Sequence, residues 1–148
     1  MTLYVYADTS ALAKRFWREP DTDLILSALA DAKAVASASL GYVELVSATC
    51  RAARRVDVAQ KDVPRVLAAI EEDWNDVVRI PVDEGVINTA AALVQEHPLR
   101  AYDAVHLAAA LRWQSLVGER VMFLAFDKEL LKAASAEGLM VQAVTPGK

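Results

Sequence analysis

Short apolar runs alternate along this chain with longer segments in which apolar residues recur every three or four positions. The short runs predict β-strands, because strands buried on both faces read as continuous apolar sequence. They lie at residues 3–7, 34–37, 77–82, 121–125 and 140–144. The segments with helical spacing predict helices at residues 11–17, 40–55, 57–74, 86–96, 101–113 and 128–136, and one more that begins at residues 20–23. This alternation predicts a three-layer α/β/α fold, Rossmann-like, with helices on both faces of a central, mostly parallel sheet.

Polar and small residues mark where some of these elements begin and end. Thr9 and Ser10 offer a cap for the first helix, and Gly118 and Gly138 are breaks after two later helices. The chain has no internal repeat, low-complexity stretch or linker. We therefore expect one domain over residues 1–148, with a loose tail at its last four residues.

Composition adds an expected partner and limits how nucleic acid could bind. Hydrophobic residues make up 55% of the chain, above the roughly 45–50% of ordinary globular proteins. Several predicted helices lack a polar face, so we expect a homodimer, in which the second copy covers some of the exposed apolar surface. The net charge is −4, from 20 acidic and 16 basic residues. This argues against nucleic-acid binding through bulk positive charge, although acids gathered around metal ions would leave local basic patches to hold phosphate.

The cellular location is expected to be cytoplasmic. The single cysteine, Cys50, cannot form an intramolecular disulfide, which fits a reducing compartment. Asp8 interrupts the first apolar run too early for a signal peptide. No apolar stretch reaches the roughly 18 residues that a membrane span needs, so no membrane association is expected.

Two acids directly follow predicted strands. Asp8 comes after the strand at residues 3–7, and Asp127 follows the strand at residues 121–125. Ligands of open α/β sheets bind at the carboxyl ends of the strands. The two carboxylates therefore reach the same edge of the sheet if their strands are neighbours. The alternative is that each acid only caps the helix that follows it.

Two further acids, Glu44 and Asp103, interrupt helices that otherwise look buried. A buried carboxylate without a partner is costly, so each of them needs a cation or strong hydrogen-bond donors. A metal ion would meet this need. The alternative is a buried salt bridge, for which Arg100 and Lys14 are the candidate donors.

Four carboxylates without a cysteine or histidine cluster favour a hard ion, Mg²⁺ or Mn²⁺, over zinc. His106 can offer only one nitrogen, and it fits better as a hydrogen-bond partner of the acids. Hard ions held by carboxylates polarise phosphate groups, generate hydroxide from water, and stabilise entering and leaving oxygens. The sequence therefore points to phosphodiester hydrolysis.

Four segments, each holding one of the acids, resemble motifs of PIN-domain proteins, and of the VapC-type toxins in particular. They are residues 6–14, 43–48, 99–108 and 126–134, of which the third is the most specific. The resemblance runs from residue 3 to about residue 144. It departs at Ala125, where many members of the family carry Thr or Ser, so one hydrogen bond of the site is expected to be absent.

The resemblance implies a PIN-like fold and a Mg²⁺- or Mn²⁺-dependent endoribonuclease, the toxin of a toxin–antitoxin pair. Such toxins cut structured RNA such as tRNA or rRNA and are silenced by a cognate antitoxin protein. The acids that it assigns to catalysis and to metal binding are Asp8, Glu44, Asp103 and Asp127. Ser10 and Thr9 are expected to support these acids through hydrogen bonds.

Basic residues after the first motif are candidates for RNA contact. Lys14, Arg15 and Arg18 follow Asp8 closely, and their charge complements phosphate. A second basic cluster lies at the end of the helix at residues 40–55, where favourable interaction with the helix dipole is the alternative explanation.

Three rival functions fit parts of the pattern. A haloacid-dehalogenase-like phosphatase needs a second aspartate where this chain has Ser10. A receiver-like signalling domain needs paired acids after the first strand and a lysine after the fifth, and only Asp83 matches its pattern. A catalytically inactive PIN-like interaction module has Ala125 in its favour, and the presence of all four acids argues against it.

Overall fold

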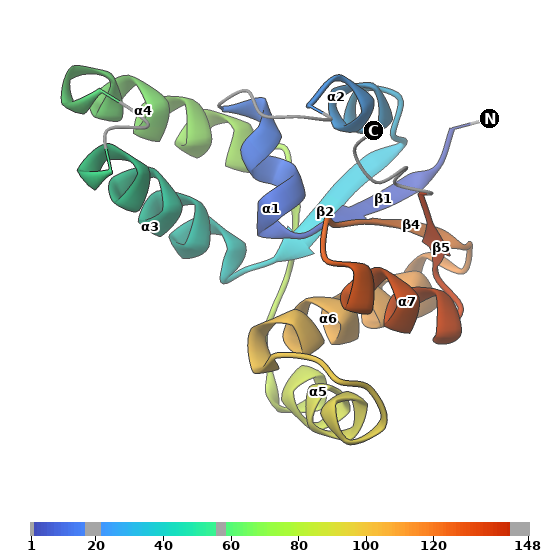
Figure 1. The fold of residues 1–148 in the computed structure, drawn as a ribbon. Helices are drawn as coiled ribbons and strands as arrows, with labels where there is room; N and C mark the ends of the chain where they lie inside the picture. The colour runs from blue at the N-terminus through green and yellow to red at the C-terminus, as the bar shows by residue number, and fades with distance from the viewer. Residues whose placement is uncertain (1, 17–21, 56–58, 143–148) are drawn as a thin grey trace.

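In the computed structural model, residues 2–16, 22–55 and 59–142 are described, and strands and helices alternate through them (Figure 1). The strands are β1 (Tyr4–Ala7), β2 (Ala34–Ala38), β3 (Val78–Ile80), β4 (Val121–Leu124) and β5 (Met140–Val141). The helices are α1 (Thr9–Leu12), α2 (Thr22–Ala30), α3 (Gly41–Arg54), α4 (Val63–Trp74), α5 (Glu84–Glu96), α6 (Ala101–Val117) and α7 (Lys128–Ala136). Two short 3₁₀ helices precede α2 and α4, at Ala13–Arg15 and Gln60–Asp62.

The strands form one sheet in the order β3-β2-β1-β4-β5, and all of its pairings are parallel. β1 is central, with Tyr6 paired to Ala36 of β2 on one side and to Phe123 of β4 on the other. The strands that precede Asp8 and Asp127 are therefore neighbours. This order is that of the first five strands of a Rossmann sheet, 3-2-1-4-5-6, whereas a receiver-like domain has the order 2-1-3-4-5. The receiver-like alternative is therefore wrong.

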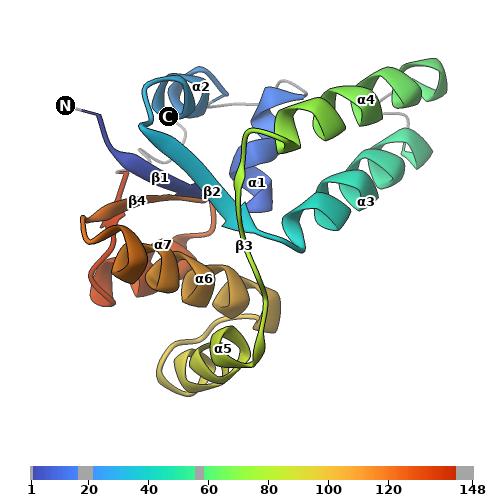
Figure 2. The same cartoon turned by 180° about the vertical axis from the view of Figure 1, so that it is seen from behind.

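Helices cover both faces of the sheet, and an apolar core lies on each face (Figures 1 and 2). Helices α1 to α4 lie over one face, and α5 to α7 lie over the other. Successive side chains of a strand point to opposite faces, and β1 follows this rule. Val5 and Ala7 belong to the core under α1 to α4, and Tyr6 belongs to the core under α5 to α7. The predicted three-layer α/β/α architecture is confirmed.

The first helix begins earlier than predicted because its cap is a different residue. The carboxylate of Asp8 accepts a hydrogen bond from the backbone N–H of Ala11 at 3.0 Å. Thr9 and Ser10, expected as caps, are the first two residues of α1 itself. The helix is also short, and it passes into the 3₁₀ helix Ala13–Arg15. Its predicted end, Trp17, lies outside the described residues.

Other helices also differ from the prediction at their ends, and α4 and α6 differ most. α4 begins at Val63 rather than at residue 57, and Pro64 lies in its first turn, the part of a helix that tolerates a missing backbone N–H. α6 continues to Val117 and ends at Gly118, whose φ of 72° is left-handed and suits glycine. Residues 20, 21, 57 and 143–148, which include the start of the second helix and the expected tail, lie outside the described residues. Within the described ranges, no helix has the length and apolarity to cross a bilayer.

Candidate active site

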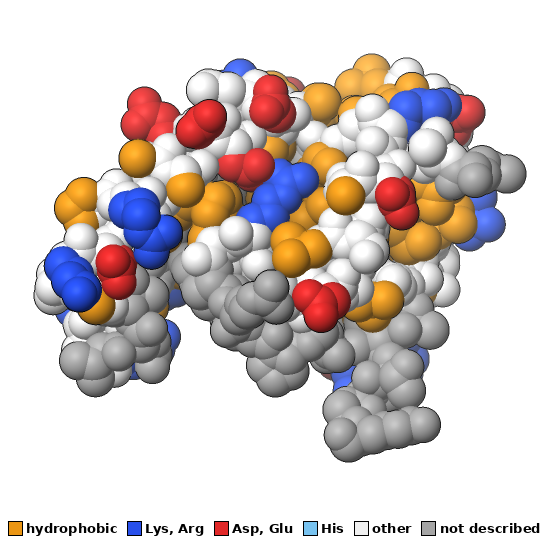
Figure 3. Space-filling model, turned by 90° about the horizontal axis from the view of Figure 1, so that it is seen from above, with side chains coloured by type: hydrophobic (Ala, Val, Ile, Leu, Met, Phe, Trp, Pro, Cys, Tyr) orange, Lys and Arg blue, Asp and Glu red, His pale blue; other side chains and the backbone are white. Residues whose placement is uncertain are grey.

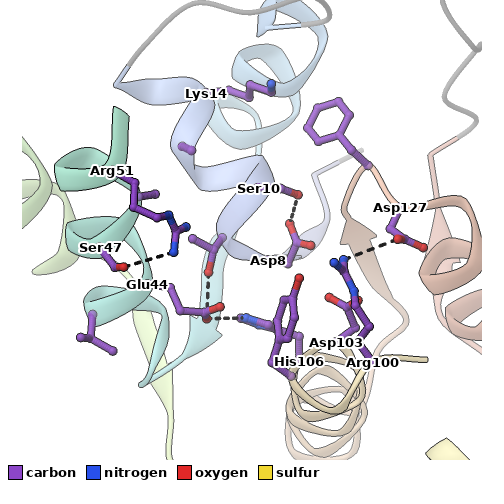
Figure 4. Close-up of a pocket in the computed structure, with 16 residues that line it drawn as sticks. Asp8, Ser10, Lys14, Glu44, Ser47, Arg51, Arg100, Asp103, His106 and Asp127 are labelled. Atoms are coloured by element: carbon purple, nitrogen blue, oxygen red, sulfur yellow. Dashed lines mark hydrogen bonds and ion pairs between the residues drawn. The ribbon is translucent and has the colours of Figure 1, made fainter. Parts of the chain in front are cut away.

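The four predicted acids line one pocket of about 940 Å³ at the carboxyl edge of the sheet (Figure 4). Each comes from a different part of the fold. Asp8 follows β1, Asp127 follows β4, and Glu44 and Asp103 lie in the first turns of α3 and α6. Because β1 and β4 are adjacent and α3 and α6 lie on opposite faces of the sheet, the fold brings together acids that are distant in sequence.

Asp8 is held in place by the first turn of α1. Its Oδ1 accepts hydrogen bonds from the Ser10 hydroxyl at 2.6 Å and from the Ala11 backbone N–H at 3.0 Å. The residue is only 6% exposed. Burial raises the pKa of Asp8, and His106 and the two hydrogen bonds oppose this shift only in part. Asp8 therefore caps a helix and also faces the pocket, so the two interpretations of this acid do not exclude each other.

Asp103 and Asp127 face each other across the guanidinium of Arg100 (Figure 4). Arg100 Nε donates to Asp103 Oδ2 at 3.0 Å, and Arg100 Nη2 lies 3.7 Å from Asp127 Oδ2. Burial raises the pKa of Asp103, and the hydrogen bond from Arg100 partly offsets that rise. Asp127 also caps α7, because its Oδ1 accepts the backbone N–H of Leu130 at 3.0 Å. The salt-bridge alternative is thus present for Asp103, although its partner is 63% exposed rather than buried.

Glu44 is held by two hydrogen bonds to the same oxygen. Its Oε1 accepts from the Thr9 hydroxyl at 2.9 Å and lies 2.8 Å from His106 Nε2. The other ring nitrogen of the buried His106 lies 2.7 Å from the Tyr6 hydroxyl, which accepts the backbone N–H of Ala38 at 3.0 Å. Burial raises the pKa of Tyr6 and keeps its phenol protonated. Because a carboxylate only accepts hydrogen bonds, we assign a hydrogen to His106 Nε2, so that the ring donates to Glu44 while its other nitrogen faces the Tyr6 hydroxyl.

Both oxygens of Asp127 contact described residues, whereas Asp8, Glu44 and Asp103 each engage a single oxygen with the described part of the chain. Among the described residues, none donates a hydrogen bond to Oδ2 of Asp8, Oε2 of Glu44 or Oδ1 of Asp103. Oxygen atoms of this kind are the ligands that Mg²⁺ and Mn²⁺ prefer. The donor set therefore fits a hard divalent ion.

The spacing of the acids indicates how such an ion would be held. Among the described residues, the side chains that bring three ligand atoms within 4.8 Å of one another are Glu96, His97 and Glu137, which do not line the pocket. The pocket acids are more widely spread. An ion bound by one or two of them would keep several water ligands, as Mg²⁺ usually does in proteins.

The residues predicted to contact RNA separate into two groups. Lys14 lines the pocket, with its ammonium 4.6 Å from the centre of the Phe126 ring. Arg15 does not line the pocket, because its Nη1 donates to both carboxylate oxygens of Asp73 on α4 at 2.7 Å. Arg15 therefore lies away from the pocket acids, and its contact with RNA stays a prediction. Arg18 lies outside the described residues.

Arg51, a member of the basic cluster predicted at the end of the helix at residues 40–55, lines the pocket from α3. Its guanidinium donates to the hydroxyl of Ser47 at 3.3 Å. Ser47, Val43 and Tyr102 also line the pocket and were not assigned to the site from the sequence. Helical spacing could have indicated Ser47, because a residue three positions after Glu44 lies on the same face of a helix.

Ala125, the position at which the sequence departs from the family motif, does not line the pocket. Its methyl group is buried in the core under α5 to α7.

The basic side chains do not gather in one patch on the face shown in Figure 3. On this face, Lys and Arg side chains lie among acidic and hydrophobic ones. This mixture agrees with the argument that bulk positive charge does not bind nucleic acid here.

Comparison with known proteins places this chain in a family. The PIN domain family matches residues 5–136. Two relatives from Mycobacterium tuberculosis, Ribonuclease VapC45 and Ribonuclease VapC49, are each 34% identical over 142 residues, which are 93% of this chain and 93% of theirs. Ribonuclease VapC47 from the same organism is 31% identical over 97% of both chains.

Solved structures show the same fold at lower sequence identity. FitAcB from Neisseria gonorrhoeae aligns with a TM-score of 0.61 and 15% identity, over 93% of this chain and 95% of that one. VapBC-5 from Mycobacterium tuberculosis, a member of the VapBC family of toxin–antitoxin systems, aligns with a TM-score of 0.56 and 21% identity, over 95% and 96%. The chain therefore belongs to the PIN domain family and, within it, is a relative of the VapC ribonucleases.

Proposed function

We propose that this chain is a divalent-metal-dependent endoribonuclease that hydrolyses RNA phosphodiester bonds and acts as the toxin of a toxin–antitoxin pair. The observation that carries this proposal is the arrangement of Asp8, Glu44, Asp103 and Asp127 around one pocket. Three of these acids present an oxygen that no described residue engages. Relatives that are named ribonucleases support the reaction and the substrate class.

The chain's own residues would prepare the site for an ion and a substrate. When bound at Asp8 and Asp103, Mg²⁺ or Mn²⁺ would supply Lewis-acid activation of a phosphate and of a water molecule. Ser10 fixes the orientation of the Asp8 carboxylate, and His106 fixes that of Glu44. A carboxylate held in one orientation is ready for its ligand without rearrangement, which favours binding and catalysis.

Two basic side chains of the pocket are suited to holding the RNA backbone. The ammonium of Lys14 and the guanidinium of Arg51 line the pocket from α1's 3₁₀ extension and from α3. They can attract phosphate groups on either side of the scissile bond while the protein as a whole stays acidic. We include structured RNA such as tRNA or rRNA as the substrate class, on the family resemblance.

The proposal includes two protein partners. The solved relatives include toxin–antitoxin complexes, and we propose that a cognate antitoxin binds this chain and silences it. We also propose a homodimer. Large hydrophobic side chains are exposed on several elements, with Leu116 of α6 reaching 74% exposure, and a second copy would remove some of this apolar surface from water.

The catalytic assignment is tested by single substitutions that keep the shape of the acid and remove its charge. For Asp8→Asn and Asp103→Asn, we expect RNA cleavage in Mn²⁺ to fall by a factor of about 100 or more, because each change removes a metal ligand. The matched control is Asp83→Asn. Asp83 also follows a strand and caps a helix, α5, but it pairs with Arg112 and does not line the pocket.

The outcomes separate the proposed enzyme from an inactive interaction module. Lost cleavage in both pocket variants, with activity kept in Asp83→Asn, supports the proposal. Retained cleavage in the pocket variants would contradict the roles of these acids. A wild-type chain that binds an antitoxin but cleaves no RNA in Mg²⁺ or Mn²⁺ would favour the inactive PIN-like module instead.

A further inference from the structure

Arg100 already occupies the position of a counter-ion in the acid pocket. Its guanidinium donates to Asp103 at 3.0 Å and lies 3.7 Å from Asp127, so one side chain bridges two of the four acids (Figure 4). Within the described residues, the other lysine and arginine of the pocket contact different groups: Lys14 lies over the Phe126 ring, and Arg51 donates to Ser47. Among the described residues, Arg100 is therefore the lysine or arginine of the pocket that makes ionic contacts with the acids.

This contact is strong enough to hold the two acids and exposed enough to be exchanged. Asp103 is nearly buried, and a charge-assisted hydrogen bond to a buried carboxylate is favourable. The side chain of Arg100 is 63% exposed, so its guanidinium can move into solvent without leaving a cavity. Its remaining described contact is the Tyr102 ring, 4.8 Å away.

A divalent ion and a guanidinium cannot both be the close cation of the same carboxylates without repelling each other. We infer that Arg100 is a resident counter-ion that competes with the metal ion for Asp103 and Asp127 and so weakens metal binding. In the metal-free protein it compensates the charge of the acids. When the metal ion enters, the guanidinium leaves these oxygens. This inference rests on the metal site of the proposed function.

The test is the affinity for Mn²⁺, measured by calorimetric titration of the full chain without RNA. Arg100→Gln removes the charge and keeps a polar side chain of similar reach. We expect it to bind Mn²⁺ more tightly than the wild type, by about fivefold or more, as the loss of one competing, partly screened charge would give. Arg100→Lys keeps the charge but loses the forked geometry that reaches two carboxylates, so its affinity should fall between the two.

Arg112→Gln provides the matched control. Arg112 lies on the same helix and donates to Asp83 at 2.6 Å, but neither residue lines the pocket. We expect its Mn²⁺ affinity to equal that of the wild type. Unchanged or weaker binding in Arg100→Gln would overturn the inference and leave the metal site itself intact. Absence of Mn²⁺ binding in all four proteins would overturn the metal site as well.

A spectroscopic measurement tests the displacement directly. The Nε–H of Arg100 gives a ¹⁵N NMR signal that Arg100→Lys lacks, which assigns it. In the metal-free wild type we expect this hydrogen to exchange slowly with water, because it is bonded to Asp103. Saturating Mg²⁺ should accelerate its exchange. If this hydrogen stays equally protected at saturating Mg²⁺, the guanidinium remains on Asp103, and the inference that the metal ion displaces Arg100 is overturned.

Discussion

Asp8 illustrates how one carboxylate can serve structure and chemistry at once. One of its oxygens accepts hydrogen bonds from the hydroxyl of Ser10 and from the backbone N–H of Ala11 in the first turn of α1. Those contacts fix the side chain and need only four consecutive residues to form. Because these bonds fix the carboxylate group, its second oxygen is held in the pocket. A helix cap at the end of a central strand is thus a simple way to hold a buried acid in a single orientation.

The pKa of Asp8 leads to a prediction about stability without metal. Burial raises the pKa of Asp8 in the folded state, so the folded state binds more protons than the unfolded state. The stability that this group contributes is present below its unfolded pKa and is lost as the pH rises through its folded pKa. In chelator at pH 7, Asp8→Asn should therefore be more stable than the wild type, and this advantage should disappear in acid.

Denaturant unfolding in chelator at several pH values measures this difference. Asparagine is as good a helix cap as aspartate, so the comparison isolates the charge. Asp83→Asn is the control, and its change in stability should have the opposite sign. The hydrogen bond from Arg112 lowers the pKa of Asp83 in the folded state. This variant should lose stability at neutral pH and lose less as the pH falls. A loss of stability in Asp8→Asn that does not depend on pH would mean that Asp8 is a structural partner.

At this scale, the acids and several of their hydrogen-bond partners could be predicted from the sequence, but which acid each partner binds could not. An acid after a strand or inside an apolar helix stands out against its neighbours, as Asp103 does. The residues that bind it are set by tertiary packing. Nothing local marks that Arg15 turns to Asp73 on a distant helix, 58 positions away, or that Tyr6 in the central strand bonds to a histidine 100 positions away.

The elements followed the apolar pattern closely, with errors at their ends. α7 matches its predicted range, Lys128–Ala136, because Asp127 caps it and its apolar residues face the core. α1 is shorter than predicted because it passes into a 3₁₀ helix after Leu12, which helical spacing alone does not reveal. Capping aspartates therefore mark the starts of α1, α5 and α7, and the apolar period indicates the type of element.

The double role of Asp127 predicts that two substitutions will separate capping from chemistry. Asp127→Asn keeps a capping oxygen for the Leu130 N–H and removes the charge, whereas Asp127→Ala removes both. We expect Asp127→Ala to lower the free energy of unfolding by about 1 kcal/mol and Asp127→Asn to lower it by only a few tenths. Both variants should lose RNA cleavage.

Urea unfolding and an RNA cleavage assay on the two variants distinguish the capping role of Asp127 from its role in cleavage. If Asp127 is only a cap, Asp127→Asn will cleave RNA as the wild type does. Equal losses of stability in the two variants would instead mean that the charge, through Arg100, matters more to the fold than the cap does. The side chain of Asp127 is 41% exposed, against 25% for Glu44 and 7% for Asp103, so a large effect on folding is not expected.

The order of the strands belongs to the whole molecule and was not contained in the local pattern. Alternating strands and helices predict a parallel sheet with two covered faces, and that layer arrangement is confirmed. They do not specify that β1 lies between β2 and β4. That placement depends on which apolar faces pack best over the complete chain. It decides the site, because only with β1 beside β4 do Asp8 and Asp127 meet at one edge.

Four acids around one pocket make the stability of the whole chain depend on divalent ions. A cation that binds only the folded state stabilises it by mass action, by about 2.7 kcal/mol at a hundred times its Kd. For a chain of this length, that corresponds to a rise of roughly 5–10 °C in the melting temperature. Mn²⁺ or Mg²⁺ at that excess should give this rise, and Na⁺ at equal ionic strength should not.

The rise in melting temperature that the metal ion causes should become smaller as the pH falls. Protons compete with the ion for the carboxylates, and burial raises the pKa of Asp8 and of Asp103. The stabilisation by metal should therefore decline, as the pH falls, at a higher pH than it would for ordinary exposed carboxylates. Melting curves with Mn²⁺ and with chelator, recorded from neutral to acidic pH, measure this decline. Curves that coincide at neutral pH would contradict the metal site, and a gain that persists unchanged into acid would mean that the ion binds somewhere other than these acids.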